Sequence, residues 1–92
     1  MKGMRRVHVS IEGRVQGVFF RAGCAEHARA LGVAGWVRNA TDGRVEAVFE
    51  GAGSGVEAMV RWCRQGPAHA HVDSVDVREE TPTGETGFRV SR

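Results

Sequence analysis

The sequence predicts an α+β fold in which two helices cover one face of a mostly antiparallel sheet of four or five strands. Two observations carry this prediction. Apolar residues recur at every second position in several short segments, which is typical of strands with one buried face. Between these segments lie two stretches with apolar residues at helical spacing, each followed by glycine. The 92 residues suffice for one two-layer core, so we expect a single domain over residues 1–92.

The first strand is expected over residues 6–12, where apolar and polar residues alternate. A first helix is expected from Phe20, because Phe20, Cys24, Ala28 and Leu31 recur near helical spacing and Gly32 supplies a typical end. Residues 33–39 and 44–51 then predict two strands. The turn between them contains Asp-Gly, which is a strong hairpin signal.

The second helix is expected to begin at Ser54, because Ser54 and Glu57 have the spacing of a capping box. Gly66-Pro67 ends this helix, residues 72–80 predict a fourth strand, and residues 88–90 predict a short fifth one. The order is therefore β-α-β-β-α-β, which is the ferredoxin-like sandwich.

The segment from Gly13 to Arg21, G-R-V-Q-G-V-F-F-R, joins the first strand to the first helix. Gly13 and Gly17 allow backbone turns that other residues resist, and the amides of such a turn can form an anion-binding nest. A helix start adds free N–H groups, and Arg21 adds a planar charged group that suits phosphate. The segment thus predicts an oxyanion site, although two glycines in a strand-to-helix loop are more often only a turn and an arginine in a first helical turn is usually solvated.

Topology brings a second polar residue toward this segment. In a β-α-β unit the first two strands run the same way, so their C-terminal ends lie at one edge of the sheet. The glycine-rich segment follows the first strand, and Asn39 ends the second. We therefore expect Asn39 to lie near Arg21, while a role for Asn39 as a simple turn former stays open.

Composition argues against several classes of partner. The net charge is +2, and the basic residues are scattered, which gives no indication of a nucleic-acid surface. No stretch is apolar and long enough to span a membrane, and the N-terminus lacks the apolar core of a signal peptide. These two features lead us to expect a cytoplasmic protein. Cys24 and Cys63 fall on apolar helix faces and are expected to be buried thiols. We expect a monomer at this chain length, and His69 and His71 lack a third ligand for a metal.

Two long patterns in this chain resemble those of the acylphosphatase family. The first is G-x-V-Q-G-V-x-F-R and the second is G-W-V-x-N-x-x-x-G-x-V, found here as Gly13, Val15, Gln16, Gly17, Val18, Phe20 and Arg21, and as Gly35, Trp36, Val37, Asn39, Gly43 and Val45. The resemblance extends through Gly66-Pro67 to the terminal Phe88-Arg89-Val90 and so covers essentially the whole chain.

The resemblance implies hydrolysis of acyl phosphates to a carboxylate and inorganic phosphate, without a metal or another cofactor. It implies that Arg21 and the backbone amides of residues 16–21 bind the phosphoryl group, and that Asn39 orients the attacking water. The amides belong to Gln16, Gly17, Val18, Phe19, Phe20 and Arg21. A carboxylate leaving group, whose conjugate acid has a pKa of roughly 4, departs without protonation, so this chemistry needs no general acid.

Other functions and one structural question stay open at this stage. The same element order serves RNA-recognition domains, but the first strand lacks the aromatic residues that stack on bases. A non-enzymatic anion sensor, or the handling of carbamoyl phosphate, would use the same anion site; the absence of a further domain favours a free-standing hydrolase. The carboxylate of Arg92 would approach Arg21 only if the fifth strand runs parallel to the second.

Overall fold

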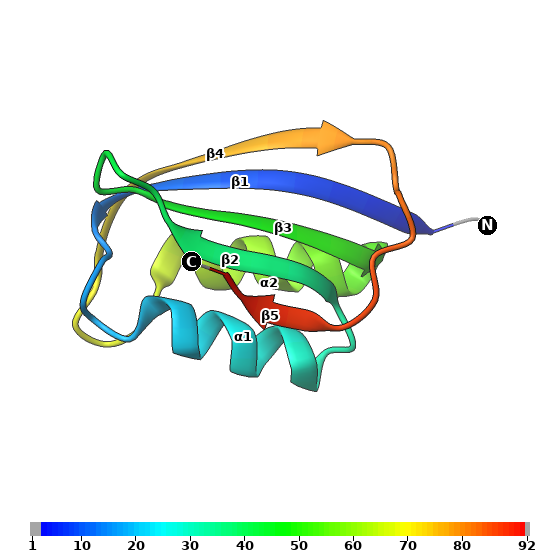
Figure 1. Cartoon of the computed structure of the whole chain (residues 1–92), viewed down its shortest axis with the longest axis horizontal. Coiled ribbons are helices and arrows are strands. Elements are labelled where there is room, and N and C mark those ends of the chain that lie inside the picture. Colours follow the sequence, from blue (N-terminus) through cyan, green and yellow to red (C-terminus); the bar gives the residue numbers. More distant parts are fainter. Residues whose placement is uncertain (1–2, 92) are drawn as a thin grey trace.

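A computed structural model describes residues 3–91 of the chain (Figure 1). The elements follow one another as β1 (Met4–Arg14), α1 (Phe20–Ala30), β2 (Ala34–Asn39), β3 (Val45–Ala52), α2 (Gly53–Gln65), β4 (His71–Glu80) and β5 (Phe88–Val90). The five strands form one sheet in the order β4-β1-β3-β2-β5. The predicted α+β, ferredoxin-like arrangement is therefore confirmed, with five strands.

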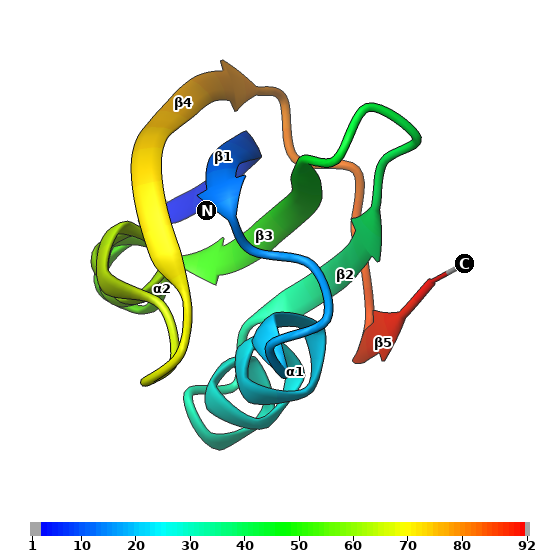
Figure 2. The same cartoon turned by 90° about the vertical axis from the view of Figure 1, so that its left-hand side faces the viewer.

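Strand directions decide which loops meet. β3 pairs antiparallel with both β1 and β2, so β1 and β2 run in the same direction on either side of it. β4 pairs antiparallel with the outer side of β1, whereas β5 pairs parallel with β2. Both helices lie on one face of the sheet (Figures 1 and 2). The β1–α1 loop, the end of β2 and the end of β5 consequently lie at the same end of the sheet, which faces the viewer in Figure 2.

The core fills the space between the sheet and the two helices. Every second residue of β1 points into it, and each helix contributes one apolar stripe, as the spacing in the sequence predicts. The buried side chains of these three elements are Val7, Val9 and Ile11 of β1, Phe20, Cys24, Ala25 and Ala28 of α1, and Val56, Met59, Val60 and Cys63 of α2. Because Phe20 is the first residue of α1, its burial fixes where the helix begins relative to the sheet.

The expected capping box of the second helix is wrong. α2 begins at Gly53, its N-cap is Ala52, and no side chain caps it. Ala52 is also the last residue of β3, so the chain passes from strand to helix without the loop that a capping serine needs. The Gly53 amide donates to the Gly3 carbonyl, 2.6 Å away. Glu57 does not turn back to the helix start and instead pairs with Arg5.

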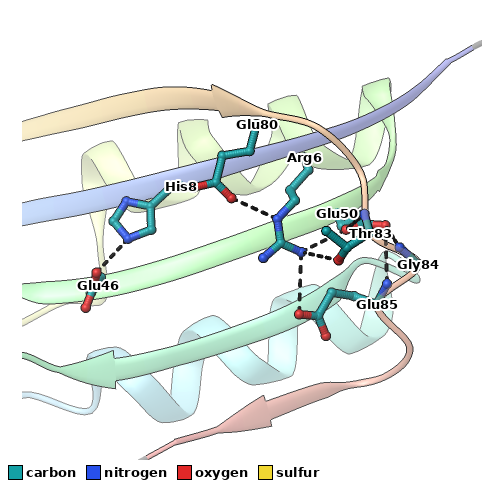
Figure 3. A network of polar contacts seen from close by, with 8 residues as sticks. All are labelled: Arg6, His8, Glu46, Glu50, Glu80, Thr83, Gly84 and Glu85. Atoms are coloured by element: carbon teal, nitrogen blue, oxygen red, sulfur yellow. Dashed lines mark hydrogen bonds and ion pairs between the residues drawn. The ribbon is translucent and has the colours of Figure 1, made fainter.

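A network of charged side chains lies at the end of the sheet opposite the β1–α1 loop (Figure 3). The Glu50 carboxylate, at the end of β3, is 2 % exposed and accepts hydrogen bonds from the backbone amides of Thr83, Gly84 and Glu85. Arg6 of β1 donates to Glu50 at 2.9 Å. The network therefore holds the segment that leads from β4 into β5.

β5 is attached to the rest of the molecule along its whole length. The Gly35 amide donates to the Gly87 carbonyl, and the Ser91 amide donates to the Val37 carbonyl at 2.8 Å. The Arg29 guanidinium of α1 donates twice to the carbonyl of Phe88. Of the two directions left open by the sequence, the structure has the parallel one, so the chain ends toward the β1–α1 loop. Arg92 lies outside the described residues, and its carboxylate is not placed.

Candidate active site

A bulge at Gly13 turns the end of β1 into the loop that precedes α1. The pairing of β1 with β4 shifts between Glu12 and Gly13. Gly13 has φ 136°, and a Cβ atom there would lie 2.1 Å from the carbonyl oxygen of His71. Only glycine fits such a close approach between two backbones. The first glycine of the segment is thus required by the sheet rather than by a ligand.

The loop itself holds two residues in the left-handed region, Gly17 with φ 72° and Phe19 with φ 63°. Phe19 is the N-cap of α1, and no side chain caps this helix. The first helical hydrogen bond runs from the Gly23 amide to the Phe19 carbonyl. The amides of Phe20, Arg21 and Ala22 therefore have no acceptor within the helix. Among residues 3–91, the amides of residues 16–19 also donate no backbone–backbone hydrogen bond.

Arg21 lies in the first turn of α1, where the uncapped amides are. No acidic residue shares this turn. Within the described chain, no hydrogen bond or ion pair joins the Arg21 side chain to another protein group, in contrast to Arg5 and Arg6. A free guanidinium beside a helix N-terminus attracts an anion through both its charge and its directed donors.

Asn39 is the last residue of β2, as predicted, and its backbone pairs with Val45 of β3. Its Oδ1 atom is buried, and no group of the described chain donates a hydrogen bond to it. A buried acceptor without a partner is costly, so such an atom indicates a missing donor such as a water molecule.

One cavity of about 360 Å³ joins these groups. Its lining consists of Val15, Gly17, Phe19, Phe20, Arg21, Ala22, Asn39 and Val90. Arg21 and Asn39 thus lie at one site, as the topology of the first β-α-β unit predicts, and four residues of the predicted cradle line the same space. Gln16 and Val18 do not line it. Val18 packs against the core.

The side chain of Gln16 binds the β2–β3 hairpin instead of lining the cavity, a contact that the sequence analysis missed. Its Nε2 atom donates to the carbonyl oxygens of Ala40 and Arg44, at 2.8 and 2.9 Å. These two residues close the β2–β3 hairpin, since the Ala40 amide also donates to the Arg44 carbonyl. Gln16 therefore ties the loop before α1 to the hairpin that begins directly after Asn39.

Val90 lines the cavity, and the sequence analysis missed it. It belongs to β5, which reaches the cavity only because this strand runs parallel to β2. The available signal was the predicted strand at residues 88–90, whose direction a sequence pattern does not determine. Val15, which belongs to the first motif, and Ala22, which follows its last residue, also line the cavity and were not predicted to do so.

The thiol nearest to Arg21 along α1 offers no alternative nucleophile. Cys24 lies one helical turn after Arg21, and its thiol is fully buried. A hydrogen bond with Cys63, together with burial, raises the pKa of the Cys24 thiol, so this group stays protonated. Among residues 3–91, no three His, Cys, Asp or Glu side chains lie together as a metal site would require. No helix in this range has the length and apolarity to span a membrane.

Comparisons with known proteins agree with this geometry. The family model described as Acylphosphatase matches residues 7–90. An acylphosphatase from Roseiflexus sp. (strain RS-1) is 62 % identical over 91 residues, which are 98 % of each chain. The structure of an acylphosphatase from Coxiella burnetii superimposes with a TM-score of 0.93 at 36 % identity, covering 98 % of this chain and 95 % of that one. The crystal structure of full-length HypF also contains this fold, with a TM-score of 0.89 at 27 % identity. The match covers 97 % of this chain and 12 % of HypF.

Proposed function

The chain belongs to the acylphosphatase family, whose members hydrolyse acyl phosphates, and we propose that its β1–α1 loop binds the phosphoryl group and that Asn39 holds the attacking water. One observation carries this proposal: an uncapped helix start, a free arginine and an unpaired buried amide oxygen line a single cavity. The substrate is an acyl phosphate, and inorganic phosphate is a product.

The phosphoryl group binds at the start of α1. The backbone amides of residues 16–21 donate to its oxygens, and the Arg21 guanidinium supplies a full positive charge beside them. The transition state of phosphoryl transfer spreads negative charge over the peripheral oxygens, so fixed donors and a fixed charge stabilise it without reorganising. At about 4 Å and an effective dielectric constant of about 20, one charge pair contributes about 4 kcal/mol.

The attacking water binds to Asn39. The unpaired Oδ1 atom accepts a hydrogen bond from the water and holds its oxygen toward the phosphorus atom. An amide is too weak a base to take the proton, so a phosphoryl oxygen of the substrate accepts it. The carboxylate departs unprotonated because its conjugate acid has a pKa of roughly 4, well below neutral pH. This route needs neither a metal nor a general acid from the protein.

Hydrolysis of benzoyl phosphate at neutral pH in excess chelator tests the proposal. Arg21→Ala should lower kcat/KM by at least about 10³-fold, because about 4 kcal/mol of charge stabilisation is removed, and should abolish competition by inorganic phosphate. Arg61→Ala, which removes an exposed arginine of α2, is the matched control and should behave as wild type. Equal phosphate competition in wild type and Arg21→Ala would refute the assignment. Phosphate binding without turnover in the wild type would instead indicate an anion sensor.

We also propose that the protein acts as a cytoplasmic monomer without a nucleic-acid partner. Cys24 and Cys63 are both free, buried thiols, which suits a reducing compartment. The sheet face on which RNA-recognition domains bind bases carries ion pairs here, among them Arg6–Glu50 (Figure 3). Sedimentation at two protein concentrations and a gel shift with mixed RNA check these expectations.

A further inference from the structure

Two apolar side chains at the candidate active site are exposed without a packing reason. Phe19 is 79 % exposed and Val90 is 42 % exposed, and both line the 360 Å³ cavity. They come from opposite parts of the chain, Phe19 from the loop before α1 and Val90 from β5. A single exposed apolar residue is common on a protein surface, but apolar side chains that gather at a cavity are typical of a ligand-binding site.

The backbone conformation of Phe19 is also unfavourable. Its φ of 63° and ψ of 23° lie in the left-handed region, which costs free energy for most residues other than glycine, asparagine and aspartate. A phenylalanine here is therefore unfavourable twice, in its backbone conformation and in its exposure. Neither cost is offset by contacts in the core, since Phe19 is not part of the core cluster.

We propose that Phe19 and Val90 form the two walls of a subsite for the acyl group and that this subsite selects apolar, in particular aromatic, acyl phosphates. The inference rests on the proposed function, because it takes the β1–α1 loop to bind the phosphoryl group. The acyl group, bonded to the phosphoryl oxygen that leaves, extends from the loop into the remaining volume between Phe19 and Val90.

The size of the cavity agrees with this occupant. A volume of about 360 Å³ falls at the small end of ligand sites, which span roughly 300–1,000 Å³. A phosphate ion fills only part of such a space. The remainder is bounded by apolar side chains, and an apolar acyl group that enters it loses contact with water, which is favourable.

The chemistry of the lining disfavours polar acyl groups. Among the described residues that line the cavity, only Arg21 and Asn39 have polar side chains, and the proposed mechanism engages both. A carbamoyl group would therefore lose its hydrogen bonds to water and find no side-chain partner in return.

The Val90 wall is held rigidly enough to discriminate between substrates. Val90 pairs with Val37 in the parallel β2–β5 ladder, and the next amide, that of Ser91, donates to the Val37 carbonyl. The other end of β5 is fixed by hydrogen bonds from Arg29 to the Phe88 carbonyl. A preformed wall binds a ligand without the cost of ordering a loop.

Direct binding of two phosphonates tests the subsite independently of turnover. Benzylphosphonate and methylphosphonate both carry the phosphoryl-like group, and they differ in the aromatic ring. Isothermal calorimetry on the wild-type protein should give a Kd for benzylphosphonate roughly tenfold lower than for methylphosphonate, a size typical of one apolar group in a pocket. Equal Kd values would overturn the proposal.

Three variants locate the preference. Phe19→Asn keeps a residue that accepts the left-handed conformation and removes the ring, and Val90→Ala shortens the other wall. Each should reduce the Kd ratio to about threefold or less. Phe19→Asn should also leave the denaturation midpoint equal or higher, whereas a structural role for the ring predicts a loss. Leu31→Ala removes an apolar side chain that is 48 % exposed outside the cavity, and it should keep the wild-type ratio.

Turnover measurements distinguish a failure of the proposed subsite from a failure of the proposed function. The ratio of kcat/KM for benzoyl phosphate to that for carbamoyl phosphate should fall in Phe19→Asn and in Val90→Ala. If either variant keeps the wild-type ratio, the two-walled subsite is wrong while the proposed function stands. If the wild-type protein binds phosphonates with the expected preference but hydrolyses no acyl phosphate, the proposed function fails and the apolar subsite stands.

Discussion

Single residues at the candidate active site act through charge and unpaired hydrogen-bonding groups rather than through proton transfer. Arg21 carries the only side-chain charge among the described lining residues, and Asn39 carries the buried unpaired acceptor. This division suits a reaction whose leaving group needs no proton, and it predicts that the two residues affect different steps.

Asn39→Ala should lower kcat for benzoyl phosphate on the order of 10²-fold, because a water that is no longer oriented reacts far less often. The inhibition constant of inorganic phosphate should change little, since the loop and Arg21 are retained. Steady-state kinetics with phosphate as the competitor measures both quantities. A variant that loses phosphate affinity as strongly as kcat would show that Asn39 binds the phosphoryl group rather than the water.

The sequence predicts Arg21 and Asn39 because both follow strands whose direction the β-α-β order determines. It does not predict the clamp formed by Gln16. The acceptors of the Gln16 side chain lie 24 and 28 positions further along the chain, and no local pattern relates an amide in a loop to two carbonyls in a hairpin. Such a contact emerges only when the loop and the hairpin are placed in space.

At the scale of elements, this clamp couples the β1–α1 loop to the β2–β3 hairpin. Gln16→Ala should lower kcat for benzoyl phosphate roughly tenfold, because the hairpin that follows Asn39 loses two hydrogen bonds, each contributing about 1 kcal/mol. The Kd of inorganic phosphate should change less than kcat. Gln65→Ala, at the exposed end of α2, is the matched control. If kcat falls no further than it does in the control, the clamp does not position Asn39.

Sequence patterns predict features within one element but not the contacts between elements. The alternation in β1 and the helical stripe of α1 predict their buried faces, because each pattern reports the burial of its own element. Leu31 is the exception, since it caps the end of α1 and is 48 % exposed. The spacing of Ser54 and Glu57 predicts a capping box wrongly, because β3 runs directly into α2 and Arg5 binds Glu57. The direction of β5 depends on hydrogen bonds with β2 and Arg29, which no pattern within residues 88–90 contains.

At the scale of the whole molecule, the two ends of the sheet have different tasks. One end carries the loop, the hairpin and the end of β5, which form the candidate active site (Figure 2). The opposite end carries the network around Glu50, which fixes the segment before β5 (Figure 3). Because Val90 lines the cavity from the far end of β5, the network supports the site through the strand that joins them.

The charge state of Glu50 should make stability depend on pH in the acid range. Burial alone would raise the pKa of Glu50, but hydrogen bonds from Arg6 and from the amides of Thr83, Gly84 and Glu85 outweigh it and lower this pKa from 4.5 to about 2. The folded-state pKa lies below the unfolded one, so the ionised carboxylate stabilises the fold fully above about pH 4.5 and this contribution is lost as the pH falls toward 2. A shift of this size corresponds to at most about 3 kcal/mol.

Glu50→Gln should therefore reduce the free energy of unfolding at pH 7 by as much as about 3 kcal/mol, and the difference from wild type should shrink steadily between pH 4.5 and pH 2. Urea denaturation followed by circular dichroism over this range measures the effect. Glu79→Gln removes an exposed carboxylate that pairs with Arg5, and it should change the free energy of unfolding little at any pH, because exposed ion pairs contribute little. A difference between wild type and Glu50→Gln that stays constant from pH 7 to pH 2 would mean that the hydrogen-bonding shape of this side chain, and not its charge, holds the segment before β5.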